Sequence, residues 1–317
     1  MVAQADTTQL LVPEVEDGAR LDRLVAVLSG VSRKEARQMI GSGRVFVKGR
    51  PAKILSKRFK AGTILEIRGD VATPDRKPAQ RDVSQQPLEV LYLDHEIIAV
   101  NKPSGLLTEH DRFGSPSLES VVPAWLESQG KDSRIWLVHR LDAVTSGVVV
   151  LARSQRAVKR LNAVFRERKA SKVYLALVQG PFAGETDVDE PIGRLKGTRH
   201  GVKADGKPAQ TFFRPVVAGR EGALIVAAPL TGRTHQIRVH LAHLGQPIVG
   251  DRLYGGSMYL GGQGQIVVPR TMLHAYRLTV PHPRGAEPIT FEAPPAADMV
   301  RLMGELDLDY VEHLKQV

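Results

Sequence analysis

The chain has 317 residues, of which 42% are hydrophobic and 25% are charged, a composition typical of a globular protein with one large core or two unequal domains. It contains no cysteine, which excludes disulfides, thiolate nucleophiles and cysteine-based zinc sites, and which fits the cytoplasm. The sequence contains neither an apolar run long enough for a transmembrane helix nor the pattern of a secretion signal, so we expect no membrane association.

The net charge of +10 is concentrated in one short segment. Residues 20–68 contain 13 Lys and Arg against 3 Asp and Glu, so this segment carries the whole excess and the rest of the chain is balanced. Charge alone leaves two interpretations open. The segment is either a surface that binds a polyanion or an ordinary solvated face.

Residues 18–69, which follow a tail of residues 1–17, have the pattern of a small module. Apolar residues at helical spacing in "RLDRLVAVL" predict a first helix. Ser32 and Glu35 form a capping-box signature, which predicts a second helix that ends near Gly41. After it, "RVFVKGRPAKI" alternates apolar and basic residues and breaks at a Lys-Gly pair, which predicts a strand and a turn, and "TILEIRG" predicts another strand.

This order of elements resembles the S-four (S4) fold, a small α/β RNA-binding domain. The polar face of the second helix is basic, and its cations are close enough together to follow a phosphate backbone. The resemblance implies RNA contacts from six basic residues of the module, namely Arg33, Lys34, Arg37, Arg44, Lys48 and Arg50.

A polar stretch with three prolines, residues 70–87, predicts a linker, and residues 88–317 form a second domain. Candidate strands cover residues 89–93, 97–100, 148–151, 173–178, 212–217 and 224–227. The segments "SQRAVKRLNAVFRERKAS" and "HQIRVHLAHLG" predict helices, and the C-terminal tail predicts another. Short turns join many of the strands, so the expected fold class is α+β with a mixed, largely antiparallel sheet.

The stretch "HRLDAVTSG" places a carboxylate, Asp142, at the mouth of a strongly apolar strand. Two later segments place further polar groups at strand ends, namely Lys172, Tyr174, Arg233, His235 and Arg238. A desolvated Asp needs a cation to remain ionised, and the planar fork of an Arg is suited to grip it. An anionic Asp held in this way could act as a nucleophile or base, or it could be part of a structural ion pair. The residues alone leave both interpretations open.

Five ordered motifs resemble the RluA family of RNA pseudouridine synthases. They are "IIAVNKPSGLLTEH", "HRLDAVTSG", "SKVYLALVQG", "GRTHQIRVHLAHLGQPIVGDRLYG" and "MLHAYRL". The resemblance implies isomerisation of uridine to pseudouridine in RNA, a reaction that needs no metal, redox partner or nucleotide cofactor. No metal site is expected from the histidines either, because no Cys or adjacent carboxylate completes a ligand set around them.

The same resemblance assigns roles to individual residues. Asp142 would be the catalytic aspartate and Arg238 its partner, while Tyr174 would pack against the uracil and help to remove the ring proton. Arg140 would fill the gap left by the everted uridine. Four residues are expected to line the substrate pocket, namely His139, Leu273, Arg233 and His235.

Several alternatives stay open at this level. Arg140 could be a plain phosphate contact, and Tyr174 an ordinary half-buried strand aromatic. Asp142 could attack the sugar, attack the ring, or remove a sugar proton to give a glycal. The expected partner is ribosomal RNA of the large subunit, with transfer RNA as the alternative, and the expected state is a monomer. A protein that keeps this fold could also be a non-catalytic RNA-binding factor.

Overall fold

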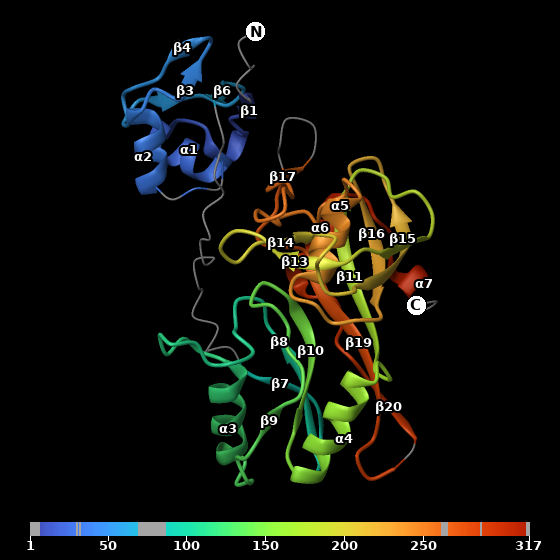
Figure 1. Cartoon of the computed structure of the whole chain (residues 1–317). Coiled ribbons are helices and arrows are strands. Elements are labelled where there is room, and N and C mark those ends of the chain that lie inside the picture. Colours follow the sequence, from blue (N-terminus) through green and yellow to red (C-terminus); the bar gives the residue numbers. More distant parts are fainter. Residues whose placement is uncertain are drawn as a thin grey trace. The chain divides into compact units, whose positions relative to one another are not determined.

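The computed structural model of the chain describes residues 7–29, 31, 33–68, 87–260, 266–285 and 287–314 (Figure 1). The chain divides into two compact units. The N-terminal unit comprises residues 1–77 and 257–269, and the C-terminal unit comprises residues 78–256 and 270–317. Apart from its last residue, the predicted linker 70–87 lies outside the described residues.

The N-terminal unit packs two helices on a small antiparallel sheet. The helices are α1 (Leu21–Ser29) and α2 (Arg33–Gly41). The sheet has the order β1-β6-β3-β4 and consists of β1 (Thr7–Leu11), β3 (Val45–Val47), β4 (Arg50–Pro51) and β6 (Ile64–Arg68). Smaller elements are η1 (Glu14–Glu16), the pair β2 (Ala19–Arg20) and β5 (Arg58–Phe59), and the pair β17 (Tyr259–Leu260) and β18 (Ile266–Val267).

Local sequence explains most of this unit. Leu21, Leu24 and Val25 are fully buried on one face of α1, as the helical spacing predicts. The β3–β4 turn has positive φ at Lys48 (50°) and Gly49 (72°), the backbone that a two-residue hairpin with the strand twist requires. Residues 1–17 were predicted to be a tail. In the structure, Thr7–Leu11 form β1, which pairs with β6, and the next residue, Val12, is buried in the core of this unit.

A ten-stranded mixed sheet forms the C-terminal unit. Its order is β12-β15-β16-β11-β19-β10-β8-β7, with β20 beside β19 and β9 beside β10. The strands are β7 (Glu89–Leu93), β8 (Ile97–Lys102), β9 (Trp136–Leu137), β10 (Ser146–Ala152), β11 (Ser171–Gln179), β12 (Thr186–Asp189), β15 (Gln210–Ala218), β16 (Gly222–Pro229), β19 (Leu273–Pro281) and β20 (Pro288–Glu292). Only β10 and β19 pair in parallel among the described strands, so the expected α+β class with a largely antiparallel sheet is confirmed.

Helices cover both faces of the sheet around β8 and β10 (Figure 1). The helix α3 (Leu118–Ser128) packs on one face of these strands and α4 (Gln155–Arg166) on the other. Residues of β10 alternate between the two cores, which explains why the strand is apolar throughout. The remaining elements are the hairpin β13 (Ile192–Arg194) and β14 (His200–Val202), and the helices α5 (Gln236–His243), α6 (Ala297–Glu305) and α7 (Val311–Leu314).

The sequence predicted neither the central strand β19 nor the helix α3. Leu118, Val122 and Leu126 recur every four residues and are buried, and Ser117 forms a capping box at its start. The internal Pro123 masks this pattern, because proline normally ends a helix. Across the described residues, no helix is both long enough and apolar enough to cross a bilayer.

Candidate active site

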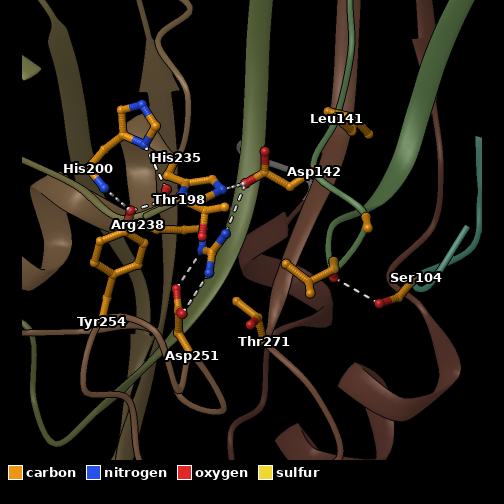
Figure 2. A network of polar contacts seen from close by, with 12 residues as sticks. Ser104, Leu141, Asp142, Thr198, His200, His235, Arg238, Asp251, Tyr254 and Thr271 are labelled. Carbon is orange, nitrogen blue, oxygen red and sulfur yellow. Dashed lines mark hydrogen bonds and ion pairs between the residues drawn. The ribbon is translucent and has the colours of Figure 1, made fainter. Parts of the chain in front are cut away.

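The loop that carries Asp142 is fixed by hydrogen bonds to its main chain. Thr108 donates its hydroxyl to the Leu141 carbonyl at 2.8 Å and accepts from the Leu141 N–H at 3.1 Å. On the other side of Asp142, the Ser104 hydroxyl donates to the Val144 carbonyl at 2.8 Å (Figure 2). Both contacts come from the segment that follows β8. The motif "NKPSGLLT" therefore sets the position of the Asp142 backbone.

Lys102, at the end of β8, also binds the main chain around this loop. Its side chain is fully buried, and its Nζ donates to the carbonyls of Leu106 at 2.8 Å and Pro103 at 3.0 Å, with a longer contact to Ala143 at 3.4 Å. Burial lowers the pKa of Lys102 to about 7, although the nearby charge of Asp142 acts in the opposite direction. Lys102 belongs to the motif "IIAVNKPSGLLTEH", but its role becomes visible only in the folded structure.

The Thr-Ser-Gly part of the motif joins β10 to β19. Gly147 has φ +112°, and a Cβ at this position would lie 2.2 Å from the Ala275 carbonyl oxygen, so only glycine allows the two strands to approach. The Ser146 hydroxyl bonds with Nδ1 of His274 at 2.9 Å, and Nε2 of that ring bonds with the Ala293 carbonyl at 3.0 Å. Ser146, Gly147 and His274 therefore hold β10 against β19, and Asp142 lies in the loop just before β10.

Arg238, on α5, is buried and bridges two carboxylates (Figure 2). Its Nη1 donates to Asp142 Oδ2 at 3.2 Å, while its Nε and Nη2 donate to the two carboxylate oxygens of Asp251 at 2.6 and 2.8 Å. Burial acts to lower the pKa of Arg238, but the hydrogen bonds and charge of Asp251, together with the charge of Asp142, raise it above its ordinary value. The Arg238 guanidinium therefore stays positively charged, and its Nη1 faces Asp142.

Asp251 is fully buried and was not singled out in the sequence. It lies within the quoted motif "GQPIVGDRLYG", 13 residues beyond Arg238. A charged residue between apolar residues and glycines was the available signal. Its bidentate grip holds the plane of the Arg238 fork, which a single contact with Asp142 would leave free to rotate.

His235 contacts Asp142 from the N-cap position of α5. Its backbone is left-handed, with φ 57°, and its Nε2 lies 3.8 Å from Asp142 Oδ2. Its Nδ1 bonds with the Tyr254 hydroxyl at 2.8 Å, and this hydroxyl accepts the backbone N–H of His200 at 3.1 Å. The contact with the Tyr254 hydroxyl orients the His235 ring so that Nε2 faces Asp142. Burial lowers the pKa of His235, so the ring is neutral near pH 7.

Tyr174 lies across β19 from Gly147, because both residues pair with Ala275 in the strand register. The register of β11 against β19 shifts between Val173 and Tyr174, a bulge of the kind that re-aims side chains. Burial, and then the charge of Asp142, raises the pKa of Tyr174 above its ordinary value, so the phenol stays protonated.

His139 and Lys172 line the same small cavity as Tyr174. Nε2 of His139 accepts the N–H of Val150 at 2.9 Å, and its ring stacks on Phe165 with centroids 4.7 Å apart. Burial, and then the charge of Lys172, lowers the pKa of His139 to about 4, so it forms a neutral wall of the cavity.

The other expected substrate contacts have different surroundings. Leu273 is buried and shares a face of β19 with Ala275, two residues on. Arg140 is exposed and pairs with Glu109. The Nε of Arg233 donates to the Pro208 carbonyl at 2.9 Å and, although the structure describes both residues, its guanidinium makes no ion pair with Asp142. The structure therefore brings Arg238 and His235 to Asp142 and leaves Arg233 outside this group.

In the N-terminal unit, Arg33, Lys48 and Arg50 are exposed. Arg37 is also exposed but lies 3.3 Å from the buried carboxylate of Asp22, and Arg44 donates to the Arg68 carbonyl at 2.9 Å. The side chain of Lys34 lies outside what the structure describes. Within the described ranges, no three His, Asp or Glu side chains converge in a way that could hold a metal ion.

Comparisons with known proteins agree with this architecture. The family model for RNA pseudouridylate synthase matches residues 96–243, and the model for the S4 domain matches residues 19–65. The human structure of RNA pseudouridylate synthase domain containing 4 is 24% identical, with a TM-score of 0.58, over 70% of this chain and 94% of that one. This likeness shows that the C-terminal unit has the pseudouridine synthase fold.

Whole-chain relatives extend the likeness to both units. The ribosomal large subunit pseudouridine synthase D of Vibrio vulnificus (strain CMCP6) is 33% identical over 99% of this chain and 98% of its own length. The protein of the same name from Xanthomonas campestris pv. campestris is 35% identical over 95% of this chain and 93% of its own length. The chain belongs to the RNA pseudouridylate synthase family, and it is an RNA pseudouridine synthase with an N-terminal S-four domain. The resemblance to the RluA family is confirmed.

Proposed function

We propose that this enzyme isomerises one or a few uridines of large-subunit ribosomal RNA, with Asp142 as the catalytic aspartate. The substrate class follows the names of relatives that match this chain along nearly its full length. The observation that carries the assignment to Asp142 is its surroundings. Its carboxylate is 24% exposed, and thus reachable, while the buried guanidinium of Arg238 lies 3.2 Å away.

The side chains around Asp142 fit the demands of the reaction. The bond between the ribose and a ring nitrogen must break, the uracil must turn, and a ring carbon must take the place of that nitrogen. Arg238 stabilises the anionic form of Asp142, and Asp251 holds Arg238 in line. A neutral His235 places its Nε2 beside the same oxygen without adding a charge.

The base itself would be enclosed by apolar and aromatic groups. We propose that the uracil lies between the ring of Tyr174 and the side chain of Leu273, which come from the neighbouring strands β11 and β19. The phenol of Tyr174 stays protonated because burial raises its pKa. It can therefore donate a hydrogen bond to the uracil ring as the ring turns. Arg140 is exposed and held only by a surface ion pair, which costs little to break, so it can move into the space left by the flipped nucleotide.

Tritium release tests this proposal. The ring carbon that forms the new bond loses its hydrogen, so RNA labelled there releases tritium during turnover. The wild-type protein should release tritium from large-subunit ribosomal RNA, and Asp142→Asn should reduce release to background while RNA binding is kept. Asp205→Asn is the matched control, because this exposed carboxylate pairs only with Lys203 at the surface.

Two outcomes would contradict the proposal. Tritium release from transfer RNA but not from ribosomal RNA would show that the substrate is transfer RNA. A wild-type protein that binds RNA but releases no tritium would favour a non-catalytic factor. We further propose that the enzyme acts as a monomer, because Asp142 finds Arg238 and His235 within its own chain, and that it acts in the cytoplasm, because a chain without cysteine fits a reducing compartment. Light scattering on the purified protein, together with fractionation of the source cells, tests both points.

A further inference from the structure

A second cavity lies in the C-terminal unit beside the strand that carries Tyr174. Its volume of about 430 Å³ falls within the range of about 300–1,000 Å³ that is usual for ligand sites. Its walls come from the segment between α4 and β11, from β12 and β15, and from the end of β16. None of the roles assigned above uses this cavity.

The floor of the cavity is apolar and open to solvent. Phe212 on β15 is 36% exposed and Leu230 after β16 is 48% exposed, and both line the cavity. An exposed aromatic ring in a concave site offers a stacking surface, and every nucleobase has a face that can stack on it.

The rim of the cavity is positively charged. Arg168, Lys169 and Lys172 line it against a single carboxylate, that of Asp187. Arg168 is exposed where the chain leaves α4, with a left-handed φ of 59°. Lys169 makes only a surface pair with Glu167 at 2.8 Å. The balance of charge therefore favours an anionic occupant such as a phosphate group.

One wall of the cavity carries a polar pair. The amide nitrogen of Gln210 donates to Asp187 Oδ2 at 2.8 Å, and both residues line the cavity. Together they present an N–H donor and carboxylate acceptors beside Phe212. This combination matches the mixed donors and acceptors on the edge of a base or on a ribose hydroxyl.

The cavity meets the small cavity of Tyr174 at Lys172, although Phe212 and Tyr174 pair with adjacent residues of β16, Ala228 and Ala227, and therefore lie on opposite faces of the sheet. Lys172 lines both this cavity and the small one that Tyr174 and His139 line. Lys172 lies near the start of β11, so one RNA strand could reach both cavities by passing around this end of the sheet. The Lys172 Nζ also donates to the Thr231 carbonyl at 2.8 Å, at the start of the loop that leads to His235.

We propose that this cavity is a subsite for one nucleotide of the RNA substrate, outside the pocket that receives the target uridine. The base would stack on Phe212, its edge or its ribose would bond to Gln210 and Asp187, and its phosphate would lie near Arg168. The inference rests on the proposed function only in taking RNA as the ligand. It adds a recognition site for a nucleotide of the RNA strand that passes the end of the sheet near Lys172.

The first test compares two full-length variants with matched exposure. Phe212→Ala removes the stacking surface, and Val300→Ala changes a residue on α6 that is 37% exposed, close to the 36% of Phe212. Binding to large-subunit ribosomal RNA, and in parallel to total transfer RNA, should weaken for Phe212→Ala by about 5- to 100-fold, the effect of losing one base–aromatic stack. A loss smaller than fivefold relative to Val300→Ala on both RNAs overturns the subsite.

The second test removes charge and does not depend on the packing of Phe212. Arg168→Gln should lower the slope of log affinity against log salt by about 0.7–0.9, as expected for one lost phosphate contact. Arg220→Gln is the control, because Arg220 is exposed at the opposite end of the β15–β16 hairpin. Equal slopes for the two variants overturn the phosphate contact.

Tritium release by the wild type separates this inference from the proposed function. A wild type that releases no tritium contradicts the proposed function, and the binding comparison still decides on the subsite. A wild type that turns over normally, with Phe212→Ala bound as tightly as its control, overturns the subsite alone.

Discussion

The bidentate pair of Arg238 and Asp251 leads to a quantitative prediction for Asp251→Asn. The carboxylate is fully buried, Arg238 is 6% exposed, and the two contacts measure 2.6 and 2.8 Å. Breaking a buried ion pair by changing one partner costs about 3–5 kcal/mol, because the remaining charge stays desolvated. For a unit of this size that corresponds to a fall in melting temperature of about 6–20 °C. Tritium release should also fall at least about tenfold, because the Arg238 fork loses its orientation toward Asp142.

Asp298→Asn provides the control within the same unit. Asp298 grips Arg270 through the same two nitrogens, also at 2.6 and 2.8 Å, but its carboxylate is 33% exposed. The expected cost is therefore smaller, about 1–2 kcal/mol, and activity should stay within about twofold of the wild type. Thermal and urea unfolding of the full chain, followed by tritium release below the melting temperature, measure both effects. Equal destabilisation by the two variants, with activity kept in Asp251→Asn, would refute the reasoning.

Three further predictions concern other parts of the chain. Gly147→Ala should cost about 3–5 kcal/mol in urea unfolding, from the positive φ and the overlap with a neighbouring strand, whereas Gly232→Ala, with nothing within 4 Å, should change stability by less than about 1 kcal/mol. Burial lowers the pKa of His274 from 6.5 to about 4. Between these values the unfolded chain binds more protons than the folded one, so stability should fall by about 2–3 kcal/mol as the pH drops through this window. His274→Asn should flatten this dependence in urea titrations, and a similar flattening in the exposed control His243→Asn would contradict the assignment. Neutralising three exposed cations of the N-terminal unit should lower the salt slope of RNA binding by about 2–3, and an unchanged slope would remove this unit from the phosphate interface. The three are Arg33, Lys48 and Arg50.

Some elements were predictable because their signals are local. Helices α1 and α4 follow apolar residues at helical spacing, and α2 follows a capping-box signature and a terminating glycine. The turn at Lys48 and Gly49 follows from the residues that accept positive φ. Strand β1 was not predictable in this way. Its five residues have no distinctive pattern, and they become a strand only because β6, more than 50 residues later, offers an edge to pair with.

The site shows the same division between local and long-range information. Asp142 could be singled out because it lies next to a strongly apolar strand, and Tyr174 because it shares one face of a predicted strand with Lys172 while the other face is apolar. Arg233 was grouped with His235 and Arg238 because all three lie where a strand passes into a helix, yet its Nε donates to the Pro208 carbonyl. A loop residue has no fixed face, so the spacing of Arg233 and His235 could not show which of these side chains reaches Asp142.

The sequence by itself determined the chemistry of the candidate groups and the order in which the chain supplies them, because residue type and local periodicity act over a few positions. Only the tertiary structure decided which groups meet. Arg238 reaches Asp142 across 96 residues of chain, and Asp251 and Tyr254 take up their supporting positions through the packing of α5 against the loop that follows it. Such partners are set by burial and hydrogen-bond satisfaction in the folded protein, where an unpaired charge costs several kcal/mol.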